Sequence, residues 1–126
     1  MSMHIKINSV NAKYALLPGD PGRCGAIADR LDMPQHLSFN REYNSYFGYI
    51  DGEGVIVCST GIGGPSAAIA VEELAAAGVK TMLRIGTCGA MQPEIHGGDL
   101  IIATAAYRHE GTSLHYAPIE YPAVAN

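Results

Sequence analysis

Three glycine-rich segments each follow a short apolar run, and this repeated pairing is the strongest constraint on what the chain can fold into. The glycine-rich segments are residues 18–22, 60–64 and 86–89. The apolar runs before them are residues 14–17, 55–58 and 81–85. Such a pairing is typical of buried strands in an open α/β sheet, where the loops at the carboxyl ends of the strands line the ligand crevice. Each loop taken alone is better explained as a tight turn with no ligand, and only the arginines described below favour a ligand site.

Helical patterns alternate with these strands. A helix is expected over residues 26–31, because Ile27 and Leu31 share one face. A second helix should begin near Pro65 and stop at Gly78. Its buried face is predicted to contain Ala67, Val71, Leu74 and Gly78.

The remaining segments complete an α/β pattern. A hairpin is expected between strands 43–50 and 55–58, and a further strand over 99–104. The order of elements predicts a single α/β domain over 1–126, with a central mixed, largely parallel sheet flanked by helices. After residue 107 the pattern shows no closing helix or strand. The chain is therefore expected to be a truncated part of a larger domain.

Charge and composition exclude several functional classes. The formal net charge of −4 argues against a nucleic-acid binder, which normally carries a basic field. No apolar run is long enough for a membrane span, and residues 1–6 lack the apolar core of a signal peptide. The three cysteines show no CxxC spacing and are expected to be free thiols in the cytoplasm.

Arginines near the glycine loops suggest an anion site. Arg23 directly follows the first loop, and Arg84 lies inside an apolar strand two residues before Gly86. Guanidinium groups together with backbone N–H donors, and a hydroxyl from Thr87, would make a site the size of a phosphate. An ion-paired structural role for Arg84 is the alternative, and Arg41 taken alone reads as a solvated surface residue.

Other chemistries find no support in the motifs. The segment 61–66 does not match GxGxxG, and no Gly-Lys-Ser/Thr pattern is present. The five histidines show neither HxxxH nor HExxH spacing, so a catalytic metal is not expected. No serine lies in a GxSxG elbow.

Five motifs in order resemble the nucleoside phosphorylase family. They are LPGDPxR at 17–23, VCSTGIGGPS at 57–66, VEEL at 71–74, RIGTxG at 84–89 and SLHYAPxEYPAVA at 113–125. The motif at 113–125 is similar to that of the uridine phosphorylase branch in particular. The resemblance covers nearly the whole chain and corresponds to the N-terminal half of such an enzyme.

The resemblance implies reversible phosphorolysis of uridine or a related nucleoside, with inorganic phosphate as co-substrate and no cofactor. It implies a phosphate site formed by Gly19, Arg23, Arg84 and Thr87, with Arg84 and Thr87 as the catalytic residues. Arg41 would reach the phosphate of a neighbouring subunit in a homo-oligomer, with a dimer as the unit and a hexamer as a further possibility.

Two further roles are implied across the same interface. His4 would contact the ribose 5′-hydroxyl in the neighbouring subunit. A monovalent cation such as K⁺ could bind at the dimer interface, with Glu42, Ile62 and Ser66 as ligands. The family's ribose-gripping and base-recognising residues match nothing in this chain. Two alternatives therefore stay open: a purine nucleoside phosphorylase on the same scaffold, and a non-catalytic truncated module that binds anions or a partner.

Overall fold

The computed structural model describes residues 2–8 and 10–125. They form two compact units, Met1–Gly86 and Thr87–Asn126. Each unit is described here by itself. The assignment of 1–126 to a single domain stays a prediction.

The first unit contains a mixed sheet. Among the described residues it has five strands in the order β2-β3-β4-β1-β5. The strands are β1 (Tyr14–Pro18), β2 (Asp32–Asn40), β3 (Tyr43–Ile50), β4 (Glu53–Cys58) and β5 (Thr81–Ile85). β1 runs parallel to β4 and to β5, whereas β2, β3 and β4 pair in antiparallel fashion. The expected α/β fold with a mixed sheet is confirmed, and its parallel part is centred on β1.

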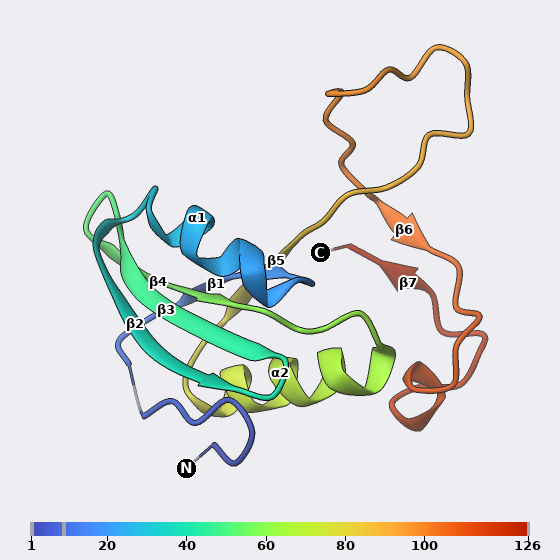
Figure 1. Ribbon diagram of the computed structural model, residues 1–126. Helices are drawn as coiled ribbons and strands as arrows, with labels where there is room; N and C mark the ends of the chain where they lie inside the picture. The colour runs from blue at the N-terminus through green and yellow to red at the C-terminus, as the bar shows by residue number, and fades with distance from the viewer. Residues whose placement is uncertain (1, 9, 126) are drawn as a thin grey trace. The chain divides into compact units, whose positions relative to one another are not determined.

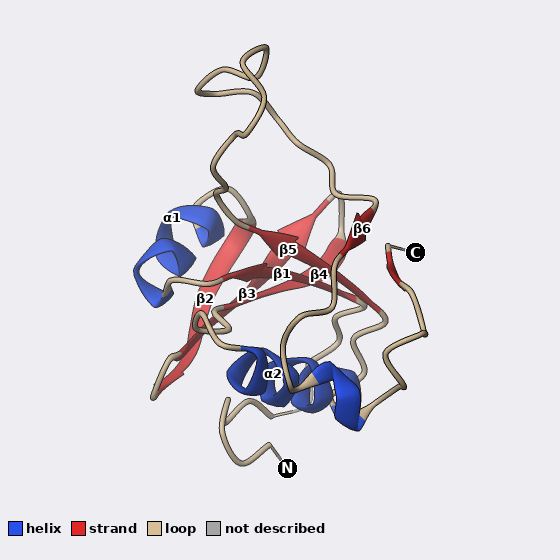
Figure 2. Cartoon of the chain, turned by 90° about the vertical axis from the view of Figure 1, so that its right-hand side faces the viewer, coloured by secondary structure: helices blue, strands red, loops and turns tan. Residues whose placement is uncertain are grey.

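Two helices cover opposite faces of this sheet (Figures 1 and 2). α1 (Cys24–Ala28) follows a 3-10 turn, η1 (Pro21–Arg23), and α2 is Gly64–Ala76. The central strands are apolar on both faces, so alternate residues serve the two layers. Ala15 and Leu17 pack in the cluster that contains the α2 residue Leu74, whereas Leu16 packs against the α1 layer.

The first helix is earlier and shorter than expected. It ends at Ala28, not at Leu31, and it is entered through η1. The Asp20 side chain accepts a hydrogen bond from the Gly22 N–H at 2.8 Å, so the chain turns helical directly after the loop. Leu31 is still buried in the α1 layer, but it is placed there by the turn into β2.

The second helix starts and stops as predicted but buries a different face. Gly78 has a φ of +109° just beyond the last turn, which suits a helix stop. Ala70 and Leu74 are fully buried, whereas Val71 is 41% exposed. The prediction for Val71 is wrong because the sheet lies against the 70/74 side of the helix.

The second unit lacks the strand expected over 99–104, which has no regular structure. Its apolar side chains Leu100 and Ile102 are exposed, and no strand of the described residues pairs with them. The unit instead contains a short antiparallel pair, β6 (Ala105–Ala106) and β7 (Ala123–Val124), with a 3-10 turn, η2 (Ser113–His115), between them.

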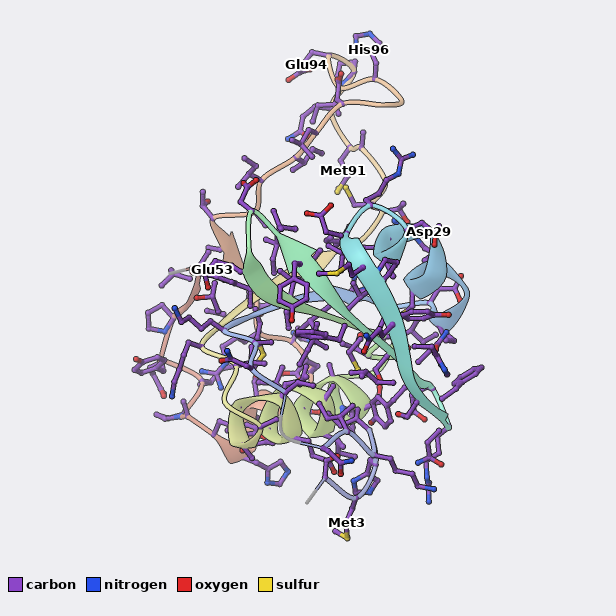
Figure 3. The ribbon with its side chains drawn as sticks, turned by 90° about the vertical axis from the view of Figure 1, so that its left-hand side faces the viewer. Met3, Asp29, Glu53, Met91, Glu94 and His96 are labelled. Atoms are coloured by element: carbon purple, nitrogen blue, oxygen red, sulfur yellow. The ribbon has the colours of Figure 1, made fainter. Side chains whose placement is uncertain are left out.

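One arginine organises the connection between β6 and β7. Arg108 donates hydrogen bonds to Ser113 Oγ and to the backbone carbonyls of Ser113, Ala117, Pro118 and Tyr121. Within the long segment before β6, the labelled residues Glu94 and His96 lie at the tip of a loop (Figure 3). None of the helices in the described part of the chain is long and apolar enough to cross a membrane.

Candidate functional site: an arginine between glycine loops

The guanidinium group of Arg84 lies against two of the three glycine loops. A Cβ built on Gly19 would be 2.9 Å from Arg84 Nη2, and one built on Gly86 would be 2.7 Å from Arg84 Nη1. Only glycine allows the backbone this close to the arginine. The register explains the approach, because Arg84 on β5 is opposite Leu17 on β1, just before the first loop.

The second glycine-rich loop, residues 60–64, lies beside Gly19 as well. The Gly19 Cβ position is also 3.3 Å from the carbonyl oxygen of Gly61. The Thr60 N–H donates to the Pro18 carbonyl at 2.9 Å, which ties the two loops together. Asn44 on β3 donates through Nδ2 to the Pro21 carbonyl at 3.0 Å and fixes the far side of the first loop. The predicted convergence of the loops holds for Gly19, Gly61 and Gly86.

Arg84 carries a positive charge without a carboxylate partner in the described residues. Its one hydrogen bond there runs from Nη1 to the Ile85 carbonyl at 3.0 Å. The structural alternative for Arg84, an ion pair, is therefore not seen within residues 2–8 and 10–125. A guanidinium beside glycine backbone is the kind of group that holds a phosphate.

Two other predicted phosphate ligands, Arg23 and Thr87, lie in different units of the chain. Arg23 is half-buried at the end of η1, and its side chain makes no hydrogen bond to any described residue. Thr87 is the first residue of the second unit and is exposed. The roles of both in phosphate binding stay predictions.

Arg41 lies at the tip of the β2–β3 hairpin. It is exposed and has a φ of +56°, a backbone conformation that residues other than glycine, asparagine and aspartate seldom adopt. The turn is held from inside by buried Ser59, whose Oγ donates to the Glu42 carbonyl at 2.6 Å and accepts from the Asn44 N–H at 2.8 Å. The fold thus presents Arg41 outward, and its role toward a neighbouring subunit stays a prediction.

Glu42 and Ser66 meet around the second glycine loop. A Cβ built on Gly61 would be 3.1 Å from Glu42 Cγ and 3.0 Å from Ser66 Oγ. Gly61 has a φ of +67°, so this position requires glycine. Ile62 next to it is 99% exposed. Carboxylate, hydroxyl and carbonyl oxygens are the ligands that hard cations prefer, so this set fits the predicted monovalent cation chemically.

No cluster of three or more His, Cys, Asp or Glu residues that could hold a metal is found in the described residues.

Tyr43 holds the backbone of Ser66 in place, because its buried hydroxyl donates to the Ser66 carbonyl at 3.0 Å. Burial and the nearby Glu42 carboxylate raise the pKa of Tyr43 to about 12, so its hydroxyl stays a donor.

His4 lies against α2, where it contacts Glu73. Its Nδ1 is 2.7 Å from Glu73 Oε1. Desolvation raises the pKa of Glu73, but hydrogen bonds from His4 and from the N–H groups of Ile5, His4 and Met3 outweigh it and bring the pKa below 4.5. Glu73 is therefore a carboxylate at neutral pH.

Reasoning from residue patterns missed three residues that build the site: Ser59, Asn44 and Glu73. Ser59 and Asn44 carry no distinctive spacing. Glu73 does carry a signal, because it lies beside Leu74 at the edge of the buried helix face, where a carboxylate needs hydrogen-bond partners.

The fold and the loop geometry together describe an α/β protein in which an arginine lies between glycine loops. A comparison with protein families matches residues 13–126 to the phosphorylase superfamily. The chain belongs to that family.

Individual relatives agree with this assignment. The chain is 58% identical to the uridine phosphorylase of Haemophilus influenzae and 55% identical to that of Escherichia coli, each over 115 residues, or 91% of this chain and 46% of the relative. It is 54% identical to a guanosine phosphorylase of Halorubrum lacusprofundi over 112 residues, or 89% of this chain and 46% of the relative. The chain thus spans about half the length of the curated relatives it matches.

Proposed function

We propose that this chain supplies the phosphate site for the reversible phosphorolysis of uridine or a related nucleoside. The observation that carries the proposal is the guanidinium of Arg84 between Gly19 and Gly86, without a carboxylate partner in the described residues. Similarity to uridine phosphorylases over 91% of the chain supports the choice of substrate.

The chemistry requires an anion site below the sugar. A phosphate oxygen forms a bond to C1′ while the C1′–N bond breaks, and the products are the free base and ribose 1-phosphate. Arg84 and Thr87 would hold and orient the phosphate, with Gly19 and Arg23 completing its cradle. Because the sugar carries positive charge when the C–N bond breaks, a fixed phosphate dianion stabilises that state. The reaction needs no cofactor.

The protein would work as a homo-oligomer in the cytoplasm. Arg41 is presented outward at a hairpin tip and would complete the phosphate site of a neighbouring subunit, as His4 would contact its ribose. Glu42, Ile62 and Ser66 would hold K⁺ at the same interface through oxygen atoms. A dimer is the smallest assembly that meets these requirements, and a hexamer is compatible with them.

Two measurements on the 126-residue chain test the phosphate site. Millimolar phosphate should raise the melting temperature, since a ligand that binds only the native state stabilises it. Arg84→Ala should remove this shift, whereas Arg30→Ala should keep it, because Arg30 is exposed and its side chain makes no hydrogen bond or ion pair with a described residue. A melting temperature unmoved by phosphate would contradict the proposal.

Turnover is tested by following uracil release from uridine with and without phosphate. Phosphate-dependent release supports catalysis by this chain. Phosphate binding without uracil release supports instead the non-catalytic alternative, in which the chain binds anions but does not catalyse the reaction.

A purine nucleoside is the second candidate substrate. It is favoured by the similarity to a guanosine phosphorylase, which at 54% identity is nearly as high as that to the uridine enzymes. Parallel assays with uridine, inosine and guanosine decide between the two substrates by which base is released.

A further inference from the structure

The carboxylate of Glu73 binds the backbone of the N-terminal segment, residues 3–5. Its oxygens accept from the N–H groups of Met3 at 3.2 Å, His4 at 3.0 Å and Ile5 at 3.0 Å, and they contact His4 Nδ1 at 2.7 Å. Three successive backbone N–H groups on one anion form a concave anion site of the kind called a nest. Figure 3 shows Met3 on this segment beside α2.

The opposite edge of the segment is held by β2. Asn40 Nδ2 donates to the His4 carbonyl at 2.7 Å, and the Ser38 hydroxyl donates to the Ile5 carbonyl. The Ile5 side chain is fully buried in the core between sheet and α2. The backbone of His4 is therefore anchored on both sides.

The anchor also decides which ring nitrogen of His4 carries the proton. An ionised carboxylate only accepts hydrogen bonds, so Nδ1 of His4 must be the donor. In the neutral ring Nε2 is then an acceptor with a free lone pair. Within the described residues Nε2 has no hydrogen-bond partner, and the side chain is 32% exposed.

We propose that Glu73 is a positioning residue that sets the Nδ1–H tautomer of His4, so that Nε2 accepts a hydrogen bond from the 5′-hydroxyl of a nucleoside. This inference rests on the proposed function for its ligand. The 5′-hydroxyl of a nucleoside donates a hydrogen bond to Nε2, whereas a 5′-deoxynucleoside leaves Nε2 without a partner. His4 in this tautomer therefore distinguishes a nucleoside from its 5′-deoxy analogue.

The tautomer is measured directly by NMR of the 126-residue chain with ¹⁵N-labelled histidine, above about pH 8, where imidazole is ordinarily neutral. His4→Gln identifies the His4 signals. We expect a protonated Nδ1 and an unprotonated Nε2. Glu73→Ala should mix the two tautomers, and Glu73→Gln should weaken the preference while keeping the side-chain size. Glu72→Ala should change nothing, because it removes the same charge from an exposed neighbour on α2.

The ligand is tested by titration with uridine and with 5′-deoxyuridine. Uridine should shift the Nε2 resonance, and 5′-deoxyuridine should not. An Nε2–H tautomer in the wild-type protein overturns the proposal, whatever the variants do. An equal response to both nucleosides, or none to either, overturns the ligand assignment. The phosphate-induced stabilisation that depends on Arg84 does not involve His4, so its outcome separates this inference from the proposed function.

Discussion

Gly19 and Arg84 are so close that an added Cβ at Gly19 would lie 2.9 Å from Nη2 of the arginine. Arg84 on β5 is opposite Leu17 on the adjacent parallel strand β1, and Gly19 directly follows that strand. This contact brings glycine backbone and a positive charge together, which is the basis of the proposed anion site.

Gly19→Ala should therefore displace the guanidinium and weaken phosphate binding by about tenfold, or ~1.4 kcal/mol. The fold should survive, because the clashing atom is the end of a flexible side chain. The measurement is the phosphate dependence of the melting temperature. Gly25→Ala is the matched control, since its Cβ would find the Tyr46 hydroxyl at an ordinary 3.6 Å. Equal phosphate shifts in both variants would count against the assigned site.

Thiol reactivity should separate Cys88 from the other two cysteines. Burial raises the pKa of Cys58 to about 12 and also raises that of Cys24, whereas Cys88 is exposed. Since the thiolate is the reactive form, a disulfide reagent at about pH 8 should label one thiol quickly in the native protein. Denatured protein, with all three thiols accessible, is the control. A second fast thiol in the native sample would show that the core is open.

Arg108→Ala should loosen the segment between β6 and β7. The wild-type guanidinium binds five acceptors there, and each charge-assisted hydrogen bond contributes about 1.5–3 kcal/mol. Amide exchange across residues 112–121 should accelerate by on the order of tenfold or more. Exchange in β1 and β4 should stay unchanged, as should the whole pattern in Arg30→Ala. Unaltered exchange at 112–121 would rule out this organising role.

Acid should expose the contribution of Glu73 to stability. Its pKa is lowered below the ordinary 4.5, so the folded state binds fewer protons than the unfolded state in the acidic range. This contribution is present above about pH 4.5 and is lost as pH falls through the native pKa. Glu73→Gln should be less stable by about 1–3 kcal/mol at neutral pH.

The gap between this variant and the wild-type protein should narrow in acid, which urea unfolding at about pH 7 and about pH 4 will measure. Glu72→Gln is the control for the loss of charge alone. A gap that stays constant across this range would mean that the carboxylate is not held in its ionised form.

The sequence carries enough information for the central strands and the loops. β1 and β4 are predictable because their residues are apolar on both faces, and Arg84 stands out because a charge interrupts such a run. β2 is not predictable, because its side chains are mostly exposed and the strand exists through its pairing with β3. The apolar run at 99–104 predicts a strand that does not form, because a strand needs a pairing partner as well as apolar residues.

The contact between His4 and Glu73 also escapes sequence reasoning. The two residues are 69 positions apart, and the pairing depends on where the N-terminal segment docks. Local patterns indicate which residues are chemically able to pair, but the docking of one segment on another is decided by the packed core around Ile5.

The two kinds of strand pairing also set an order in time. The antiparallel pairs β2–β3 and β3–β4 join neighbours in the chain, and hairpins of this kind close within microseconds. The β1–β5 pair joins distant segments and must wait for the slower closure of the long connection. Because the contact of Gly19 with Arg84 depends on the β1–β5 pairing, the proposed anion site should be completed after the hairpins. A nascent chain will acquire its hairpins before the proposed phosphate site can form.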